Sequence, residues 1–183
     1  MDEKLWEFKF EIETSTRYHE QRGATLEYLS KVVKSLSIVG SVLAFMAVAD
    51  WSKLGVGQFN SELWVAIGAI IVAVVNLFDL VFGFDSGARV HRDLYRRFQK
   101  LQEQMMRDER NWHENLNEWR ADAQGIRVDE PPTYWAVYAR SWNQTIARYG
   151  AEQNGYLRQV SLLGSLLRNV WQFSPQSFPA VER

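Results

Sequence analysis

One acidic residue stands inside an otherwise apolar run, at a position where a charge could do chemistry. Asp79 is the sole charge within residues 63–84, and helical rise places it about 7–8 Å from the inner end of that run. An ionisable side chain inside a membrane span is costly and usually pairs with another charge or serves ion passage. One interpretation pairs Asp79 with Lys34 on an antiparallel first span. The other places a ring of Asp79 carboxylates at the mouth of a cation-selective pore.

Small and polar residues accompany Asp79 in both apolar runs. Helical spacing puts one set on a single face of the second run: Ala66, Ala69, Ala73, Asn76 and Gly83. The first run has a small face of Gly40, Ala44 and Ala47, with Ser37 and Ser41 beside it. Such faces let membrane helices approach closely, and Asn or Ser can hydrogen-bond across the contact. They either pack the two spans within one protomer or line a pore between protomers, with Asp79, Asn76, Lys34, Ser37 and Ser41 as pore or gating candidates.

Catalytic and metal-binding patterns are not found. The string His91-Arg92-Asp93-Leu94 copies the start of a kinase catalytic loop, but Phe98 stands where that loop needs Asn. The three histidines do not form a zinc-binding pattern, and the chain has no cysteine. With 21 basic and 22 acidic residues, the charge gives no general attraction to nucleic acid. We therefore expect no enzyme, no catalytic residue, no metal, no cofactor and no sequence-specific nucleic-acid binding.

Two apolar runs, about residues 32–51 and 63–84, must position these side chains. Crossing the hydrocarbon core of a bilayer takes roughly 20 apolar residues. The second run reaches that length alone, and the first does so if Lys34 extends to the headgroups. The sequence predicts a two-helix transmembrane hairpin. The alternative is a buried hairpin in a soluble bundle, although soluble core helices are rarely apolar all round for this length.

The flanking charges predict an orientation. Residues 86–107 carry six basic residues against two acidic ones, and residues 17–34 carry four against two. The short connection at 50–62 has a net charge of −1. Because basic residues favour the cytoplasmic side, we expect both termini in the cytoplasm. The acidic N-terminus does not look like a signal peptide.

The remaining segments predict a cytoplasmic portion. Trp6, Phe8, Phe10 and Ile12 alternate with polar residues, which favours a short strand, so residues 1–13 are expected to form a strand-like arm for assembly or partner binding. We expect the hairpin and its helical extensions in residues 14–123, with a helix break at Gln124-Gly125. Further cytoplasmic helices are expected in residues 124–173, and a tail in residues 174–183. The expected fold class is an all-α membrane protein with a cytoplasmic helical bundle and a short N-terminal strand.

Four motifs resemble the SLATT family, whose members are bacterial two-span proteins found beside antiphage defence genes. The motifs are Arg17-Tyr18-His19, the run 77–82 (Leu-Phe-Asp-Leu-Val-Phe), the run 88–98 and Asp129-Glu130-Pro131-Pro132. The resemblance covers about residues 14–150. It implies a homo-oligomer, a tetramer or similar, in the bacterial inner membrane. It further implies a pore that a cytoplasmic partner protein or nucleotide-derived signal opens, so that depolarisation stops growth or kills the cell.

Two functions remain open at this point. The first is a gated oligomeric pore in the lipid bilayer. The second is a non-conducting two-span adaptor that anchors a cytoplasmic partner, in which Asp79 only holds the hairpin together.

Overall fold

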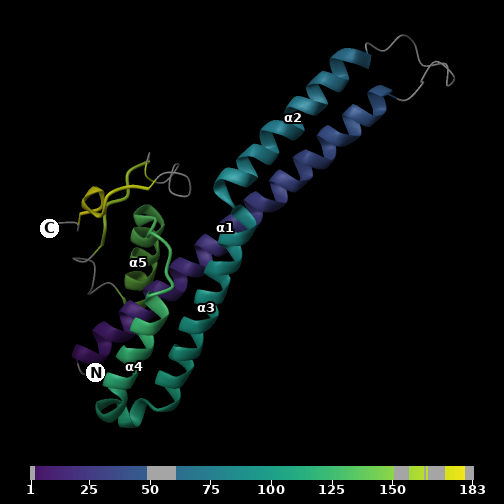
Figure 1. Ribbon diagram of the computed structural model, residues 1–183. Coiled ribbons are helices and arrows are strands. Elements are labelled where there is room, and N and C mark those ends of the chain that lie inside the picture. The colour runs from purple at the N-terminus through teal and green to yellow at the C-terminus, as the bar shows by residue number, and fades with distance from the viewer. Residues whose placement is uncertain (1–2, 49–60, 151–156, 163, 165–171, 180–183) are drawn as a thin grey trace. The chain divides into compact units, whose positions relative to one another are not determined.

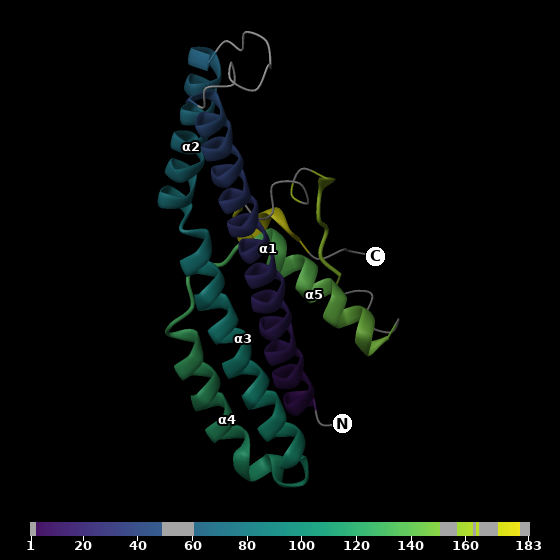
Figure 2. The ribbon, with the colours of Figure 1, turned by 90° about the vertical axis from the view of Figure 1, so that its right-hand side faces the viewer.

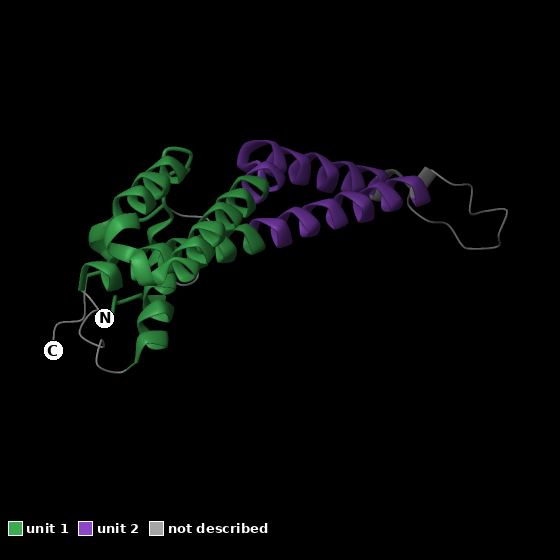
Figure 3. Cartoon of the chain, turned by 90° about the horizontal axis from the view of Figure 1, so that it is seen from below, with its two compact units in different colours: residues 1–25, 89–183 green, residues 26–88 purple. Residues whose placement is uncertain are grey.

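The computed structural model describes residues 3–48, 61–150, 157–162, 164 and 172–179. This part of the chain is mostly helical, with α1 at Glu3–Val48, α2 at Ser61–Phe82, α3 at Phe84–Arg107, α4 at Trp112–Arg127 and α5 at Trp135–Tyr149 (Figure 1). Short 3-10 helices lie at Glu109–Asn111 and Pro175–Ser177. The chain divides into two compact units, unit 1 (residues 1–25 and 89–183) and unit 2 (residues 26–88), shown in Figure 3. These borders differ from the expected borders at 13 and 123.

Unit 1 packs α3 and α4 side by side with the first part of α1 (Figure 2). The predicted helical spacing of Leu94, Phe98, Leu101 and Met105 is confirmed, and these side chains form one wall of the core. The other walls come from α1 and α4, in the order Leu5, Phe8, Ile12, Leu116, Trp119, Ala123 and Ile126. The arrangement is a small three-helix core, since each helix presents an apolar stripe at the 3.6-residue period.

The predicted N-terminal strand is wrong, because residues 5–12 belong to α1 and no strand occurs in the described part of the chain. The apparent alternation comes from a helix covered on two faces. Phe8 and Ile12 enter the core with α3 and α4. Phe10 instead meets Trp142 of α5 at a ring-centroid distance of 4.6 Å, and Trp6 stacks on Phe10. Two apolar stripes, each with helical spacing, together produce the alternation of apolar and polar residues that is typical of a strand.

Helix α5 and the segment that follows it form a second, smaller cluster. Ala136 and Ala139 of α5 are buried with Phe178, and Trp135, Val160 and Phe173 pack against them. The predicted end of this helix at Gly150 is confirmed, with Gly150 at a φ of 100°. Helix α4 continues through the expected break at Gln124-Gly125 and ends at Arg127. Most of the amphipathic stretch expected at 156–171 lies outside the described residues.

Unit 2 contains the second part of α1, the whole of α2 and the first turn of α3. In the part of the chain that the structure describes, two helices are long and apolar enough to cross a membrane, with only 11% and 6% of their most apolar stretches buried. Exposed apolar side chains run along both, among them Ile38, Phe45, Ile70, Leu77, Leu80 and Val81. These helices are compatible with a two-pass membrane protein. The connection at 49–60, and with it the end of the first predicted span, lies outside the described residues.

Candidate functional site in the hairpin and the buried histidine pair

The two helices of unit 2 touch at a glycine crossing. A Cβ atom built on Gly68 would lie 2.6 Å from the carbonyl oxygen of Gly40 and 2.9 Å from the backbone nitrogen of Ala44. Backbones this close leave no room for a side chain at either glycine. Gly40 and Ala44 therefore lie at a packing contact, as their small size indicates.

Only part of the small face predicted for the second span meets α1. Ala66, Ala69 and Ala73 are all exposed in the structure, and Gly68 makes the contact instead. Both faces of α2 are lined by small or apolar residues, so composition alone did not distinguish them. A single protomer therefore leaves the side chains of three alanines exposed, Ala66, Ala69 and Ala73.

Gly83 also differs from its predicted role in packing. It lies between α2 and α3 with a φ of +54°, a region that L side chains rarely adopt. Its N–H donates to the carbonyl of Asp79 at 2.8 Å, and its own carbonyl accepts from the Ser86 hydroxyl at 2.8 Å. Gly83 thus terminates the second apolar helix and allows α3 to begin at the next residue.

Polar groups of the two spans meet about one helical turn from the glycine crossing, since Ser37 precedes Gly40 by three residues. The Ser37 hydroxyl donates to Oδ1 of Asn76 at 3.2 Å, and the Ser41 hydroxyl donates to the Ser37 carbonyl at 2.8 Å. Ser37 and Ser41 also line an open groove of about 340 Å³ with Ile38, Val42 and Phe45. The structure therefore brings three of the gating candidates together, and two of them face a groove.

Lys34 and Asp79 do not pair. The Lys34 ammonium lies 3.4 Å from Oδ1 of Asp85, in the first turn of α3. Oδ1 of Asp79 is shielded by protein and has no hydrogen-bond partner in the described part of the chain. A shielded charged oxygen without a partner is costly. The interpretation of Asp79 as the structural partner of Lys34 is therefore not supported by this geometry.

Unit 1 contains a buried polar cluster that the sequence analysis did not identify. Nδ1 of His19 lies 2.9 Å from Nδ1 of His91, and Nε2 of His19 lies 3.1 Å from Oε1 of Glu130. Both imidazoles are almost fully buried, and the ring of Phe98 stacks on His19. Burial, the neighbouring His19 and Arg22 together lower the pKa of His91 from 6.5 to about 3. His91 is thus held in its neutral form at physiological pH.

Aromatic and cationic groups complete this cluster. The Tyr18 hydroxyl accepts a hydrogen bond from the backbone N–H of Tyr134 at 3.0 Å. The guanidinium of Arg22 lies 3.6 Å from the centre of the Tyr134 ring. Burial raises the pKa of Tyr18 to about 12, so its hydroxyl stays protonated. These contacts fasten the segment before α5 to one stretch of α1.

The cluster joins three of the segments that carry the family resemblance: residues 17–19, 88–98 and 129–132. The helical spacing of the two histidines in the sequence contained a signal for this cluster. His19 follows the core residue Ile12 by seven positions, and His91 precedes the core residue Phe98 by seven. A histidine that occupies a core position in each of two helices indicates a buried pair.

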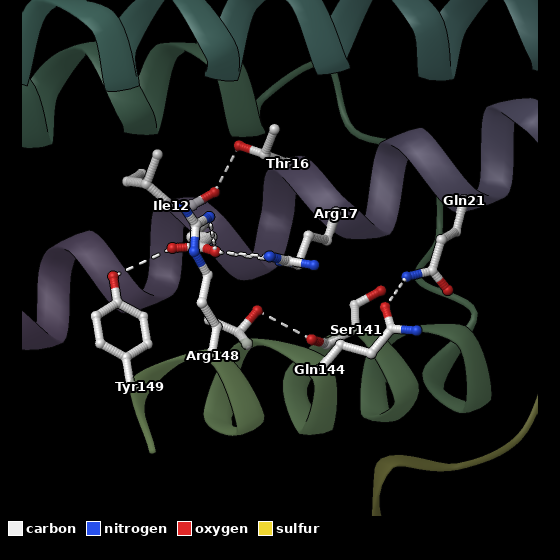
Figure 4. Close-up of polar contacts among 10 residues, drawn as sticks. Ile12, Thr16, Arg17, Gln21, Ser141, Gln144, Arg148 and Tyr149 are labelled. Carbon is white, nitrogen blue, oxygen red and sulfur yellow. Dashed lines mark hydrogen bonds and ion pairs between the residues drawn. The ribbon is translucent and has the colours of Figure 1, made fainter.

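A second polar site joins α1 to α5 (Figure 4). Oε1 of Glu13 accepts from Arg17 at 3.0 Å and from Arg148 at 2.7 Å, while Oε2 accepts from the Tyr149 hydroxyl at 3.1 Å. Burial alone would raise the pKa of Glu13, but the bonds from Arg148 and Arg17 hold it below its usual value. One buried carboxylate therefore ties α5 to α1.

No group of three or more His, Cys, Asp or Glu side chains in the described residues could hold a metal ion. No protein-family model, no curated protein and no solved structure matches this chain.

Proposed function

We propose that this chain is a non-enzymatic membrane effector that assembles as a homo-oligomer, a tetramer or similar, into a gated cation pore. It spans the bacterial inner membrane twice, with both termini in the cytoplasm, and depolarises the membrane to stop growth or kill the infected cell. The resemblance to the SLATT family supports the defence role and a trigger by a cytoplasmic partner protein or nucleotide-derived signal. The physical support comes from unit 2.

The observation that carries this proposal is the state of Asp79. Its Oδ1 is shielded and has no hydrogen-bond partner among the described residues, while the Lys34 cation lies beside Asp85. A carboxylate in an apolar helix needs compensation, and insertion scales put the cost of an Asp at mid-span at about 2.5–3.5 kcal/mol. Passing cations, held by carboxylates from several protomers, supply that compensation in a pore.

The surface of the hairpin supports assembly. Ala66, Ala69 and Ala73 are exposed, and Ser37 and Ser41 line an open groove on α1. Small residues allow a further helix to approach closely, and hydroxyls can bond across the contact. A single protomer leaves these features uncovered.

The orientation follows from the basic residues on α3. Arg89, Arg92, Arg96 and Lys100 are exposed and recur on one face of this helix. The positive-inside rule places them in the cytoplasm, so unit 1 would receive the signal there.

The test is ion flux from liposomes that contain the purified chain, with Asp79→Asn compared with wild type. We expect the variant to reduce cation flux at least tenfold with the oligomer size unchanged, because the carboxylate at the mouth of the pore is lost. Asp108→Asn is the matched control, since it removes one exposed carboxylate outside the spans. Equal flux from Asp79→Asn and wild type would contradict the role of Asp79.

A non-conducting adaptor is the second candidate function. The tight Gly40–Gly68 crossing and the Ser37–Asn76 bond favour it, because they show that the hairpin packs within one protomer. Under this function Asp79→Asn and Lys34→Met would change only thermal stability. Liposomes would show no flux with or without a cytosolic extract from infected cells.

A further inference from the structure

The His19–His91 contact restricts how many protons the packed form of unit 1 can hold. A bond between the two Nδ1 atoms, 2.9 Å apart, needs one proton between them. Nε2 of His19 faces the Glu130 carboxylate and therefore donates a proton to it. In the neutral pair, His91 supplies the shared proton from its Nδ1, and the Nδ1 of His19 accepts it.

One additional proton from the solvent fits this geometry. This proton binds Nε2 of His91 while the shared proton passes to Nδ1 of His19, so that His19 becomes an imidazolium that donates to Glu130 on one side and to Nδ1 of His91 on the other. The carboxylate of Glu130 balances the new charge. The shared bond survives because the Nδ1 of His91 now acts as its acceptor.

A second additional proton does not fit. Both Nδ1 atoms would then carry hydrogens pointing at each other across 2.9 Å, in a site where both rings are buried. Two imidazolium charges would also lie close together beside the Arg22 cation, with one carboxylate to balance them. Burial first, and then the charges of His19 and Arg22, lower the pKa of His91.

The groups around the pair do not relieve this repulsion. From α1 it is faced by Tyr18 and Arg22, and from the segment before α5 by Glu130 and Tyr134. The remaining neighbours are the Phe98 ring from α3 and the Tyr138 ring from α5, which contacts Tyr18. Glu130 is the only carboxylate among these neighbours, and it already faces His19.

We propose that the His19–His91 pair is an acid-sensitive latch on unit 1. The packed form accepts at most one additional proton at the pair, whereas a form with separated rings accepts two, so acidification favours separation. Separation disturbs the stretch of α1 that holds the segment before α5 through His19–Glu130, Tyr18–Tyr134 and Arg22–Tyr134. The latch acts whether or not the hairpin conducts ions.

The test is hydrogen–deuterium exchange of the full chain in lipid nanodiscs between pH 7.5 and 5.0, corrected for the pH dependence of intrinsic exchange. We expect the opening constant of residues 128–134 to rise as the pH falls below about 6.5, approaching tenfold per pH unit, because the open form binds one more proton. His91→Asn should abolish this rise, since its amide can donate to the Nδ1 of His19 but cannot titrate. His113→Asn is the matched control, because His113 is the exposed third histidine, and it should keep the rise.

Nitrogen-15 NMR of the histidines in the wild-type chain tests the latch without a variant. The three histidines give three imidazole signals, and we expect one buried ring to stay neutral at pH 5. Two buried rings that both titrate near pH 6.5 would overturn the proposal. So would a rise in the opening constant that is as steep in His91→Asn as in wild type.

Discussion

At the residue scale, the chain places its charges where neighbouring groups fix their state. Glu13 is buried but surrounded by Arg17, Arg148 and Tyr149, so its carboxylate stays ionised. His91 is buried against another imidazole and stays neutral. Asp79 has a shielded oxygen with no such neighbour in the described residues. Among these three groups, Asp79 is the one for which the described residues show no hydrogen bond at Oδ1.

Glu13→Gln should destabilise unit 1 by about 1.5–3 kcal/mol, because the charge-assisted bonds of a buried carboxylate are lost. The loss should also depend on pH. The pKa of Glu13 is lowered on folding, so its contribution is present above the unfolded value near 4.5 and disappears as the pH falls through the folded value. Denaturant unfolding of the full chain in detergent at pH 7 and pH 3.5 measures both effects.

Glu20→Gln is the control for this prediction, because Glu20 is an exposed glutamate on the same helix. We expect it to change stability by less than about 0.5 kcal/mol. If Glu13→Gln destabilises no more than Glu20→Gln, the carboxylate does not fasten α5 to α1.

At the element scale, helical periodicity predicted much of the fold and failed where a helix has two covered faces. The helix that carries Leu94 to Met105 buries one face in the core, so the helical spacing of these residues was sufficient to predict it. Residues 5–12 pack against α3, α4 and α5, so their two stripes imitated a strand. Gly125 lies inside α4, at a position where a Cβ would meet nothing within 4 Å. The low helix propensity of glycine therefore predicted a break that does not occur.

The glycine crossing gives a prediction for the hairpin. Gly68→Val should separate α1 from α2, because even the Cβ would lie 2.6 Å from the backbone oxygen of Gly40. The chain has no native cysteine, so Ser37→Cys with Asn76→Cys reports the contact by disulfide formation. We expect the yield to fall several-fold when Gly68→Val is added.

Gly125→Ala is the matched control for the crossing. It should leave the yield unchanged and stabilise α4 by about 0.5–1 kcal/mol, since alanine loses less backbone entropy in a helix. A disulfide yield that is the same with and without Gly68→Val would contradict the close crossing.

At the scale of the whole molecule, the two units differ in what covers them. Unit 1 has an apolar core and buried polar contacts of its own, whereas the apolar helices of unit 2 are almost uncovered. The two long apolar runs of the sequence predicted the exposed helices of unit 2. The histidine pair and the choice of Gly68 over the alanines could not be predicted as readily, because both depend on which faces of two helices meet.

The exposure of unit 2 predicts how the protein fractionates. An apolar surface of this extent is stable in lipid and unstable in water. We expect the chain to stay in the membrane pellet after a sodium carbonate wash. Release into the supernatant would show that another protein surface covers the hairpin, as in a soluble bundle.

The most direct test of the central claim is the reversal potential of the reconstituted chain in a planar bilayer with asymmetric KCl, in the presence of a cytosolic extract from infected cells. We predict a current that selects K⁺ over Cl⁻, with the selectivity reduced in Asp79→Asn and reversed toward anions in Asp79→Lys. A current whose ion selectivity is the same in all three proteins, or no current from any of them, would contradict a cation pore lined by Asp79.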